Sequence, residues 1–200
     1  MANATADYGF VPVKSYGGEI RHIRCAIAAG YGTVIGVGDA VSLDGSGFGG
    51  NPTVRVAPAD TSTIMIFGVV VGIEATGPDG LATLHSAAST AGTALVVPAL
   101  PGTVFRVNAS GATGASQNDI GMRFDHVLGT ADTLTGKSGY ALDMGEDAQA
   151  ASATENGWLL IGFDDRPDNE FSTTLSTDTI NVDCLVTCVE SSWANGNGVG

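Results

Sequence analysis

Apolar and β-branched residues along this chain gather in short segments, which are separated by glycine, proline and small polar residues. The strongest segment runs from Thr63 to Ile73, is dense in isoleucine and valine, and contains Gly68 and Gly72. β-branched residues favour strands, and a glycine inside a strand often marks a bulge or a sharp bend. Bends of that kind allow a sheet to close into a small barrel. The pattern therefore predicts strands and a curved sheet.

Similar strand signals recur at short intervals over most of the chain. They lie at Gly18–Ala29, Thr33–Val37, Ala40–Leu43, Thr53–Ala57, Ala94–Val97, Thr103–Asn108, Arg123–Leu128, Trp158–Phe163 and Thr179–Val189. The helical candidate, Glu146–Thr154, is short and alanine-rich. Short strands with turn residues between them are typical of a barrel or a sandwich. The prediction is an all-β (mainly β) fold: a small β-barrel or sandwich with glycine-rich loops, an extended N-terminal arm and little helix.

Residues 1–19 differ from the rest because they contain three aromatic residues and Pro12 but show no clear alternation. They could form an extended arm that packs on a neighbouring molecule, or an edge strand or frayed terminus. We expect a single β-rich domain over residues 20–190, within which residues 140–190 could form a small acidic lobe. Residues 191–200 are rich in glycine and asparagine and are expected to be a flexible tail.

The chain carries few charges, and most of them are negative. Lysine and arginine number 8 against 21 aspartates and glutamates, for a formal net charge of −13. Residues 140–200 contribute eleven acidic residues and one basic residue, whereas residues 1–30 have a net charge of +1. An acidic surface repels phosphate backbones, so nucleic acid is not an expected partner. The two ends of the chain are expected to face different surroundings.

The sequence also bears on where the protein is made. The N-terminus has neither the basic start nor the apolar stretch of a signal peptide. The longest near-continuous apolar run, Ile64–Ile73, is shorter than the roughly 20 residues of a membrane-spanning helix. Cys25, Cys184 and Cys188 are odd in number and too few for a disulfide scaffold. We expect a soluble protein made in the cytoplasm, with reduced thiols and no membrane partner.

Two segments imitate nucleotide-binding motifs without the structural context that such motifs need. Ala131–Ser138 matches a relaxed phosphate-loop pattern, but a poor helix follows it, and a phosphate loop places its ligand at a helix N-terminus. Gly45–Gly50 satisfies GxGxxG and is followed by another strand-like run. An exposed turn and a hairpin loop are the favoured interpretations. No motif predicts a cofactor or a catalytic residue, so we do not expect an enzyme.

Candidate metal ligands are sparse. The three histidines, His22, His85 and His126, lie in unrelated contexts. Cys184 and Cys188 share one face of an expected strand but lack the further ligands that zinc requires. The densest group of side-chain oxygens is formed by Asp164, Asp165, Asp168, Asn169 and Glu170. Oxygen ligands suit calcium, and a bound cation and a solvated acidic loop both remain open interpretations of this group.

Five stretches of the chain carry a family resemblance. They are Met1–Val13, Val37–Val41, Phe67–Ile73, Gly139–Asp143 and Gly162–Glu170. Together they resemble the small capsid decoration (cement) proteins of tailed bacteriophages. The resemblance implies a β-rich module on the exterior of the virion capsid, often a trimer, whose partner is the major capsid protein. It implies a structural role, in which contacts between major capsid subunits are stabilised, and no catalytic residue.

An N-terminal segment with aromatic residues and a local excess of base could lie on such a capsid. The expected contact residues are Tyr8, Phe10, Pro12, Lys14, Tyr16, Arg21 and Arg24. Aromatic and arginine side chains dominate the energetics of many interfaces. Deleting residues 1–19 is then expected to abolish capsid binding and to leave the fold intact.

Two alternatives remain open. The chain could be another virion structural protein, such as a tail-tube or neck component, which would also be rich in strands. It could instead be a ligand- or carbohydrate-binding β module, with Trp158 and Trp193 as platforms for sugar rings.

Overall fold

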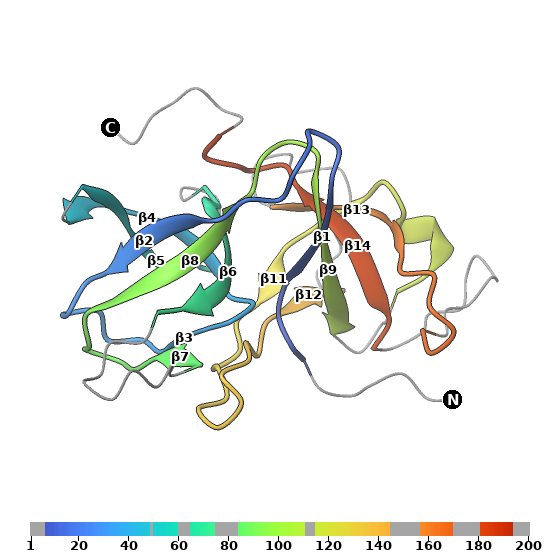
Figure 1. Cartoon of the computed structure of the whole chain (residues 1–200). Coiled ribbons are helices and arrows are strands. Elements are labelled where there is room, and N and C mark those ends of the chain that lie inside the picture. The colour runs from blue at the N-terminus through green and yellow to red at the C-terminus, as the bar shows by residue number, and fades with distance from the viewer. Residues whose placement is uncertain are drawn as a thin grey trace.

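The computed structural model describes residues 7–48, 50–59, 65–74, 84–110, 115–144, 157–169 and 181–193. Within these ranges the chain forms fourteen strands and a three-residue 3-10 helix, Gln117–Asp119, and the strands fall into two halves that lie side by side (Figure 1). The predicted all-β fold is confirmed. The helical candidate Glu146–Thr154 lies outside the described residues. No helix among the described residues has the length and apolar character needed to cross a membrane.

One half is a closed five-stranded barrel. Its strands, in order around the barrel, are β2 (Ile23–Ile27), β5 (Asn51–Val56), β4 (Ala40–Phe48), β6 (Gly68–Ile73) and β8 (Gly92–Pro98). The irregularity expected within β6 is present, because its register with β8 shifts between Val70 and Gly72. Gly68 lies so close to β8 that a Cβ there would stand 2.4 Å from the carbonyl oxygen of Val97. A short ribbon accompanies the barrel and consists of β3 (Ile35–Gly36) and β7 (His85–Ser86).

The other half is a seven-stranded sheet. Its order is β10 (Arg123–Phe124), β13 (Trp158–Phe163), β14 (Asp183–Cys188), β9 (Thr103–Ser110), β12 (Ala141–Asp143) and β11 (His126–Val127), and β1 (Val11–Ser15) pairs separately with β9. β9 is the central strand, since it pairs with β1, β14 and β12. Residues 140–190 contribute β12, β13 and β14 to this sheet.

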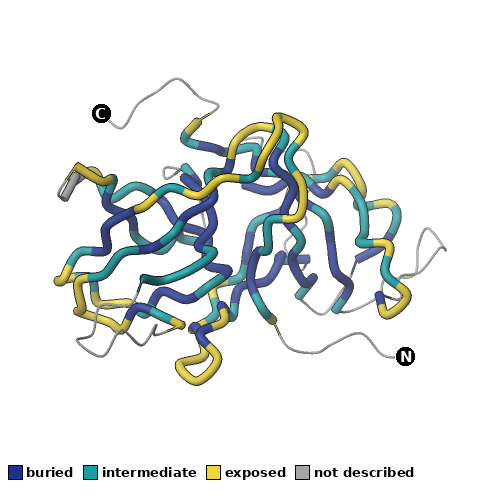
Figure 2. The backbone as a smooth tube through the Cα atoms, in the orientation of Figure 1, coloured by how far each residue is buried: buried dark blue, intermediate teal, exposed yellow. Residues whose placement is uncertain are grey.

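The two halves share a hydrophobic core. One cluster of buried side chains fills the barrel and includes Val41 and Val96. A larger cluster spans both halves, because Val69 of the barrel wall belongs to the same cluster as Phe105 and Trp158 of the sheet. Figure 2 shows buried backbone running through the region where the halves meet. A continuous core of this kind is expected to make barrel and sheet fold as one unit.

The N-terminal segment belongs to the sheet. Val11–Ser15 runs antiparallel to β9 at an edge, with Pro12 opposite Phe105. The register shifts between Pro12 and Lys14, which leaves Val13 as the bulged residue. Of the two interpretations of residues 1–19, the edge strand describes residues 11–15, while residues 1–6 lie outside the described ranges.

Phe10 is a core residue and not a surface anchor. Its side chain is 1% exposed. Its ring stacks on Trp158 with 4.1 Å between centroids and meets His126 edge-on at 6.1 Å. Such aromatic pairs contribute roughly 0.5–1.5 kcal/mol beyond the burial of their surface. Deleting residues 1–19 would remove this side chain, so we now expect the deletion to destabilise the fold as well.

The C-terminal end is also packed where it is described. Ser191 is fully buried, and its hydroxyl donates a hydrogen bond to the carbonyl oxygen of Ala99 at 2.5 Å. Residues 191–193 therefore pack on the fold, and the remainder of the expected tail, residues 194–200, lies outside the described ranges.

Three stretches of backbone cross where the two halves meet. The N–H of Phe10 donates to the carbonyl of Gly38 at 2.8 Å, and the N–H of Ser138 donates to the carbonyl of Val37 at 2.8 Å. Gly9 has a φ of +75°, and a Cβ on it would stand 2.4 Å from the Cβ of Ser138. Gly38 has a φ of +101°, which glycine adopts without steric cost. The crossing therefore requires residues without side chains at these two positions.

The ionisable side chains of Asp39 and His126 are almost completely buried in the fold. Asp39 is 1% exposed and accepts a hydrogen bond from the N–H of Gly36 at 2.8 Å, and burial raises its pKa to about 6. His126 is equally buried, and burial lowers its pKa to about 4. Its Nε2 lies 3.3 Å from the carbonyl oxygen of Ala57, and its Nδ1 lies 3.4 Å from the indole N–H of Trp158. These contacts fit a neutral ring that carries its proton on Nε2.

Replacing Phe10 should therefore cost far more stability than replacing a surface aromatic. We expect Phe10→Ala to lower the free energy of unfolding by about 3–5 kcal/mol, because it removes a buried ring and leaves a cavity. Tyr16→Ala, at a side chain that is 70% exposed, should change it by less than about 0.5 kcal/mol. Urea denaturation followed by tryptophan fluorescence measures both values, and similar values for the two variants would contradict the packing of Phe10.

Asp39→Asn should stabilise the protein at neutral pH, with a gain that shrinks on acidification. The folded pKa of about 6 lies above the ordinary value of 3.8, so between these values the folded state binds more protons than the unfolded state. The wild-type protein therefore gains stability from this group as the pH falls, whereas asparagine is neutral throughout. The difference between the two proteins should shrink by about 2 kcal/mol from pH 7 to pH 4. Urea denaturation at several pH values measures it, and the contribution of His126 cancels because both proteins contain that residue. A difference independent of pH would contradict the buried carboxyl group.

Candidate functional site

One face of the seven-stranded sheet points away from the shared core. Strand pairing places five residues side by side on that face: Arg123, Leu159, Thr187, Val104 and Lys14. We call these residues the outer row. Side chains alternate between the two faces of a strand, and the neighbours Phe105 and Val186 accordingly lie in the core. The outer row thus crosses five strands and ends at β1.

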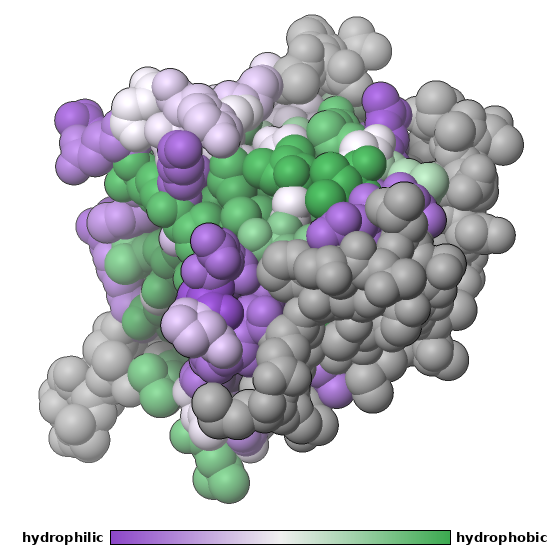
Figure 3. Space-filling view, turned by 90° about the vertical axis from the view of Figure 1, so that its right-hand side faces the viewer, coloured by the Kyte–Doolittle hydropathy of each residue, from purple (hydrophilic) through white to green (hydrophobic). Residues whose placement is uncertain are grey.

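The two ends of the outer row are basic, and its middle is apolar. Lys14 and Arg123 are exposed, Leu159 and Thr187 are partly buried, and Val104 is buried. The Nζ of Lys14 lies 4.4 Å from the ring centroid of Tyr16, which is 70% exposed. A cation at this distance from an aromatic face is attracted to it. Figure 3 shows the side of the molecule at the right of Figure 1, where hydrophobic residues gather next to hydrophilic ones.

The Lys14–Tyr16 pair adjoins further exposed apolar residues. The N–H of Tyr16 donates to the carbonyl of Gly102 at 3.0 Å, which places the ring beside the turn between β8 and β9. Leu100 in that turn is 43% exposed, and the bulged Val13 is 42% exposed. Lys14, Tyr16, Val13 and Leu100 form what we call the β1 patch. The patch combines a positive charge with apolar surface on a chain whose net charge is −13.

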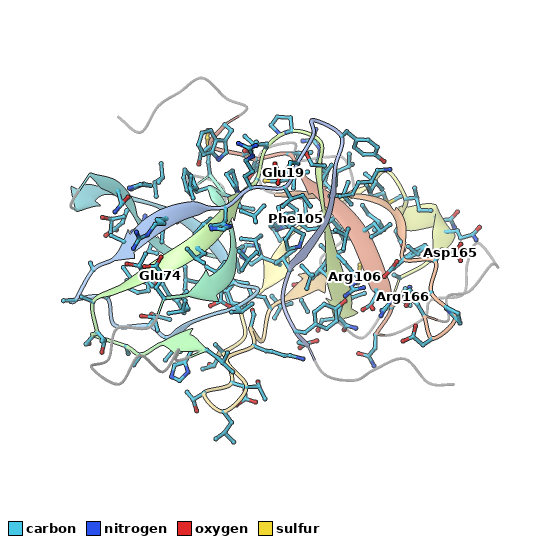
Figure 4. The ribbon with its side chains drawn as sticks, viewed as in Figure 1. Glu19, Glu74, Phe105, Arg106, Asp165 and Arg166 are labelled. Carbon is cyan, nitrogen blue, oxygen red and sulfur yellow. The ribbon has the colours of Figure 1, made fainter. Side chains whose placement is uncertain are left out.

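Two arginines pair with the acidic residues at the other end of the sheet. Arg106 lies 3.1 Å from Asp164, and Arg166 lies 2.8 Å from the same carboxylate. Arg166 also pairs with Asp183 and lies 3.8 Å from Asp168. Figure 4 shows Arg106 and Arg166 on the same half of the molecule, with Asp165 farther out. Asp164, Asp168 and Asp183 thus have arginine partners within their own chain.

Tyr8 and Asn108 extend this network. The hydroxyl of Tyr8 donates to Asp183 at 2.6 Å, and the side-chain amide of Asn108 lies 3.4 Å from the same carboxylate. Burial raises the pKa of Tyr8, and the hydrogen bond to Asp183 adds to the rise. The Arg106 guanidinium lies 5.8 Å from the Tyr8 ring centroid. Tyr8 is therefore held by groups of its own chain through both its ring and its hydroxyl.

In the acidic group considered for a cation, two carboxylates, Asp164 and Asp168, have arginine partners. Asp164 and Asp168 contact Arg166, and the side chain of Asn169 bonds to backbone groups, including the N–H of Asp183 at 2.9 Å. Among the described residues, no three His, Cys, Asp or Glu side chains are placed to hold a metal ion. Glu170 lies outside the described ranges.

The structure separates the residues expected to contact a capsid. Lys14, Tyr16, Arg21 and Arg24 are exposed, Tyr8 and Pro12 are partly buried, and Phe10 is buried. Arg21 pairs with Glu19 at 3.0 Å, and Arg24 of the barrel pairs with Glu74 at 2.5 Å. Figure 4 shows Glu19 and Glu74 far apart, so the structure does not bring these two arginines together. It brings together Lys14 and Tyr16.

The remaining sequence motifs have structural explanations. Ala131–Ser138 lies in the loop between β11 and β12, and a strand follows it where a phosphate loop needs a helix. Gly45–Gly50 lies at the β4–β5 hairpin, although Gly49 is not described. The three cysteines are buried, and burial raises the pKa of Cys25 to about 11. These thiols are therefore protonated and shielded from solvent.

The two tryptophans differ in their exposure. Trp158 is completely buried and offers no surface to a sugar ring, which corrects its assignment as a platform. Trp193 is 45% exposed, and its indole N–H donates to the carbonyl of Phe67 at 2.9 Å.

No protein-family model matches this chain, and neither a curated protein nor a solved structure matches it. Sequence reasoning missed the outer row and the paired arginines, because both join residues that are distant in the chain. A signal for the arginines was present, since Arg106 is a charged residue inside an apolar strand and Arg166 is the single base among residues 140–200.

Removing Arg166 should destabilise the sheet because it leaves Asp183 without its cation. The Asp183 side chain is 10% exposed, and an unpaired carboxylate at such a site is costly. We expect Arg166→Met, which keeps the aliphatic part of the side chain, to lower the free energy of unfolding by about 2 kcal/mol, a value reduced by the partial exposure of the arginine. Arg21→Met, at an exposed pair, should change it by less than about 0.5 kcal/mol. Equal effects in urea denaturation would show that the network adds nothing to stability.

Proposed function

We propose that this chain is a structural virion protein that binds the outer surface of a phage capsid and stabilises contacts between major capsid subunits. The observation that carries the proposal is the β1 patch, in which Lys14 and Tyr16 stand together and exposed on a strongly acidic chain. The resemblance of five sequence stretches to capsid decoration proteins supplies the class of partner.

The β1 patch has the physical character of a docking surface. A tyrosine offers a large amphipathic contact area and has few rotatable bonds to immobilise on binding. The contact with Lys14 already restricts the Tyr16 ring, so less conformational freedom is lost when a partner arrives. Because β1 is paired with β9 along its length, the patch is presented on a strand that is held in place.

The patch alone is smaller than a stable interface. Specific interfaces bury roughly 800 Å² on each partner, so binding through this patch requires surface beyond its four residues. The exposed ends of the outer row, Lys14 and Arg123, and the partly buried Leu159 and Thr187 supply part of that surface, whereas Val104 is 3% exposed and adds none. Under this proposal the acidic remainder of the molecule faces water and keeps the decorated particle soluble.

The proposal includes self-association, with a trimer favoured, on the capsid exterior. Copies that share a rigid shell gain effective concentration for each further contact. Weak contacts between neighbouring copies would therefore be sufficient once the copies are bound.

Changes in the β1 patch should weaken capsid binding without altering the fold. We expect Lys14→Glu combined with Tyr16→Ala to lower the affinity for capsids of the source phage that lack this protein by tenfold or more, because an interface anchor and its charge are lost. Arg55→Glu combined with Ile120→Ala is the control, since it makes a similar charge and apolar change outside the β1 patch and the outer row, at a partly exposed arginine and a 45% exposed isoleucine. Co-sedimentation with the capsids measures binding, and circular dichroism checks the fold. Equal losses in both variants would refute the assignment of the patch.

The alternatives differ in copy number and in ligand. A copy number close to that of the major capsid protein, measured by mass spectrometry on purified particles, would support decoration, whereas a few dozen copies would favour a tail or neck component. Trp193 is the observation that favours a carbohydrate-binding module, because it is 45% exposed beside the ring of Phe67. A glycan that binds the wild-type protein but not Trp193→Ala would favour that function.

A further inference from the structure

The loop between β11 and β12 carries a solvent-exposed leucine. Leu134 is 90% exposed, more than any other large hydrophobic residue in the described ranges. Figure 2 shows the loop as an exposed projection beyond the body of the molecule, near the boundary between the two halves. A large apolar side chain at the tip of a projection has an unfavourable contact with water in the isolated molecule.

The loop is ordered by its own hydrogen bonds. The carboxylate of Asp132 accepts hydrogen bonds from the N–H of Leu134 at 2.8 Å and from the hydroxyl of Thr135 at 2.9 Å. These hydrogen bonds hold the pKa of Asp132 below its usual value, so the carboxylate stays charged. The N–H of Gly136 donates to the carbonyl of Asp132 at 2.7 Å, and the N–H of Asp132 donates to the carbonyl of Lys137 at 2.9 Å. Hydrogen bonds within residues 132–137 therefore hold the turn that carries Leu134.

The base of the loop is fastened to the barrel half. The N–H of Val37 donates to the carbonyl of Gly136 at 2.8 Å. Gly136 has a φ of +68°, and a Cβ on it would stand 2.0 Å from the Cβ of Leu84. The contact leaves no space for a side chain at position 136. Leu134 therefore lies on an ordered turn, so less conformational freedom is lost when a partner binds.

Two further exposed leucines lie at the base and at the start of this loop. Leu84, which packs at the base of the loop, is 54% exposed, and Leu128, which begins it, is 47% exposed. We call Leu84, Leu128 and Leu134 the leucine tip. Residues 128–138 carry one acidic residue, Asp132, and one basic residue, Lys137, so the loop is neutral on a chain with a net charge of −13.

We propose that the leucine tip is a contact between copies of this chain. Two bodies of equal negative charge repel one another, so they approach most readily through a neutral, apolar projection that keeps the acidic surfaces apart. Around a rotation axis the same tip from each copy can meet its equivalents without a separate pocket, and Asp132 of one copy can face Lys137 of the next. The contact is small and adds to others, because stable interfaces bury far more surface than three leucines provide.

This inference deepens the proposed self-association and does not depend on the capsid. A single introduced cysteine tests it, because the three native cysteines are buried. We expect Leu134→Cys to form disulfide-linked dimers in solution, under a mild oxidant, at least tenfold faster than Ile120→Cys, which places a thiol at a 45% exposed position on the sheet half. Non-reducing electrophoresis of the full chain measures the rates. Equal rates for the two variants would overturn the proposal.

A second measurement distinguishes a specific contact between copies from random collisions of the introduced thiols. In sedimentation equilibrium at high protein concentration, Leu134→Asp should lower the average mass relative to the wild-type chain, while Leu134→Met should preserve it. A wild-type chain that is monomeric throughout, or an oligomer indifferent to Leu134→Asp, would also overturn the proposal. Capsid binding is measured separately, so a self-contact without capsid binding would refute the proposed function and leave this inference standing.

Discussion

The relation between barrel and sheet depends on the crossing of backbones at Gly9, Gly38 and Ser138, where the distances leave no room for a side chain on either glycine. The hydrogen bond from Phe10 to Gly38 sets the position of the Phe10 ring, which then stacks on Trp158 inside the sheet half. The segment that follows Phe10 becomes β1 and carries the β1 patch. The segment that precedes Ser138 becomes the loop of the leucine tip. Both exposed surfaces therefore take their positions from one tightly packed junction, and a bulky residue at Gly9 or Gly38 would disturb them together.

The position of each charged side chain in the fold decides which partner it has. Five arginines have a carboxylate partner: Arg21, Arg24, Arg55, Arg106 and Arg166 are each paired with an aspartate or a glutamate. Arg106 and Arg166 bring cations to the acidic residues after β13, where unpaired carboxylates in a partly buried setting would be costly. Lys14 contacts an aromatic ring instead and remains exposed at the surface. The chain thus pairs most of its cations internally and presents a basic group beside apolar residues on one strand.

The sequence predicted the fold class and many strands, because burial on both sides of a strand leaves dense apolar runs. Trp158–Phe163 was predicted with the limits that β13 has, and the irregularity in β6 followed from its glycines. For β1 the sequence left an edge strand as one of two interpretations, because Pro12 and the bulge at Val13 interrupt the alternation that identifies a strand. The candidate site was harder to predict. Tyr8, Phe10 and Tyr16 look alike in the sequence, and partners as distant as Asp183 and Trp158 decide which of them is exposed.

The edges of the seven-stranded sheet have a consequence for the solubility of concentrated protein. A long, regular outer strand offers unpaired N–H and C=O groups on which other chains can stack without limit, as in amyloid fibrils. The barrel is closed and has no such edge. The two ends of the sheet order, β10 and β11, are two residues long, and β1 contains a proline and a bulge. These edges are short or irregular, which makes the native sheets poor templates for the growth of fibrils from concentrated protein.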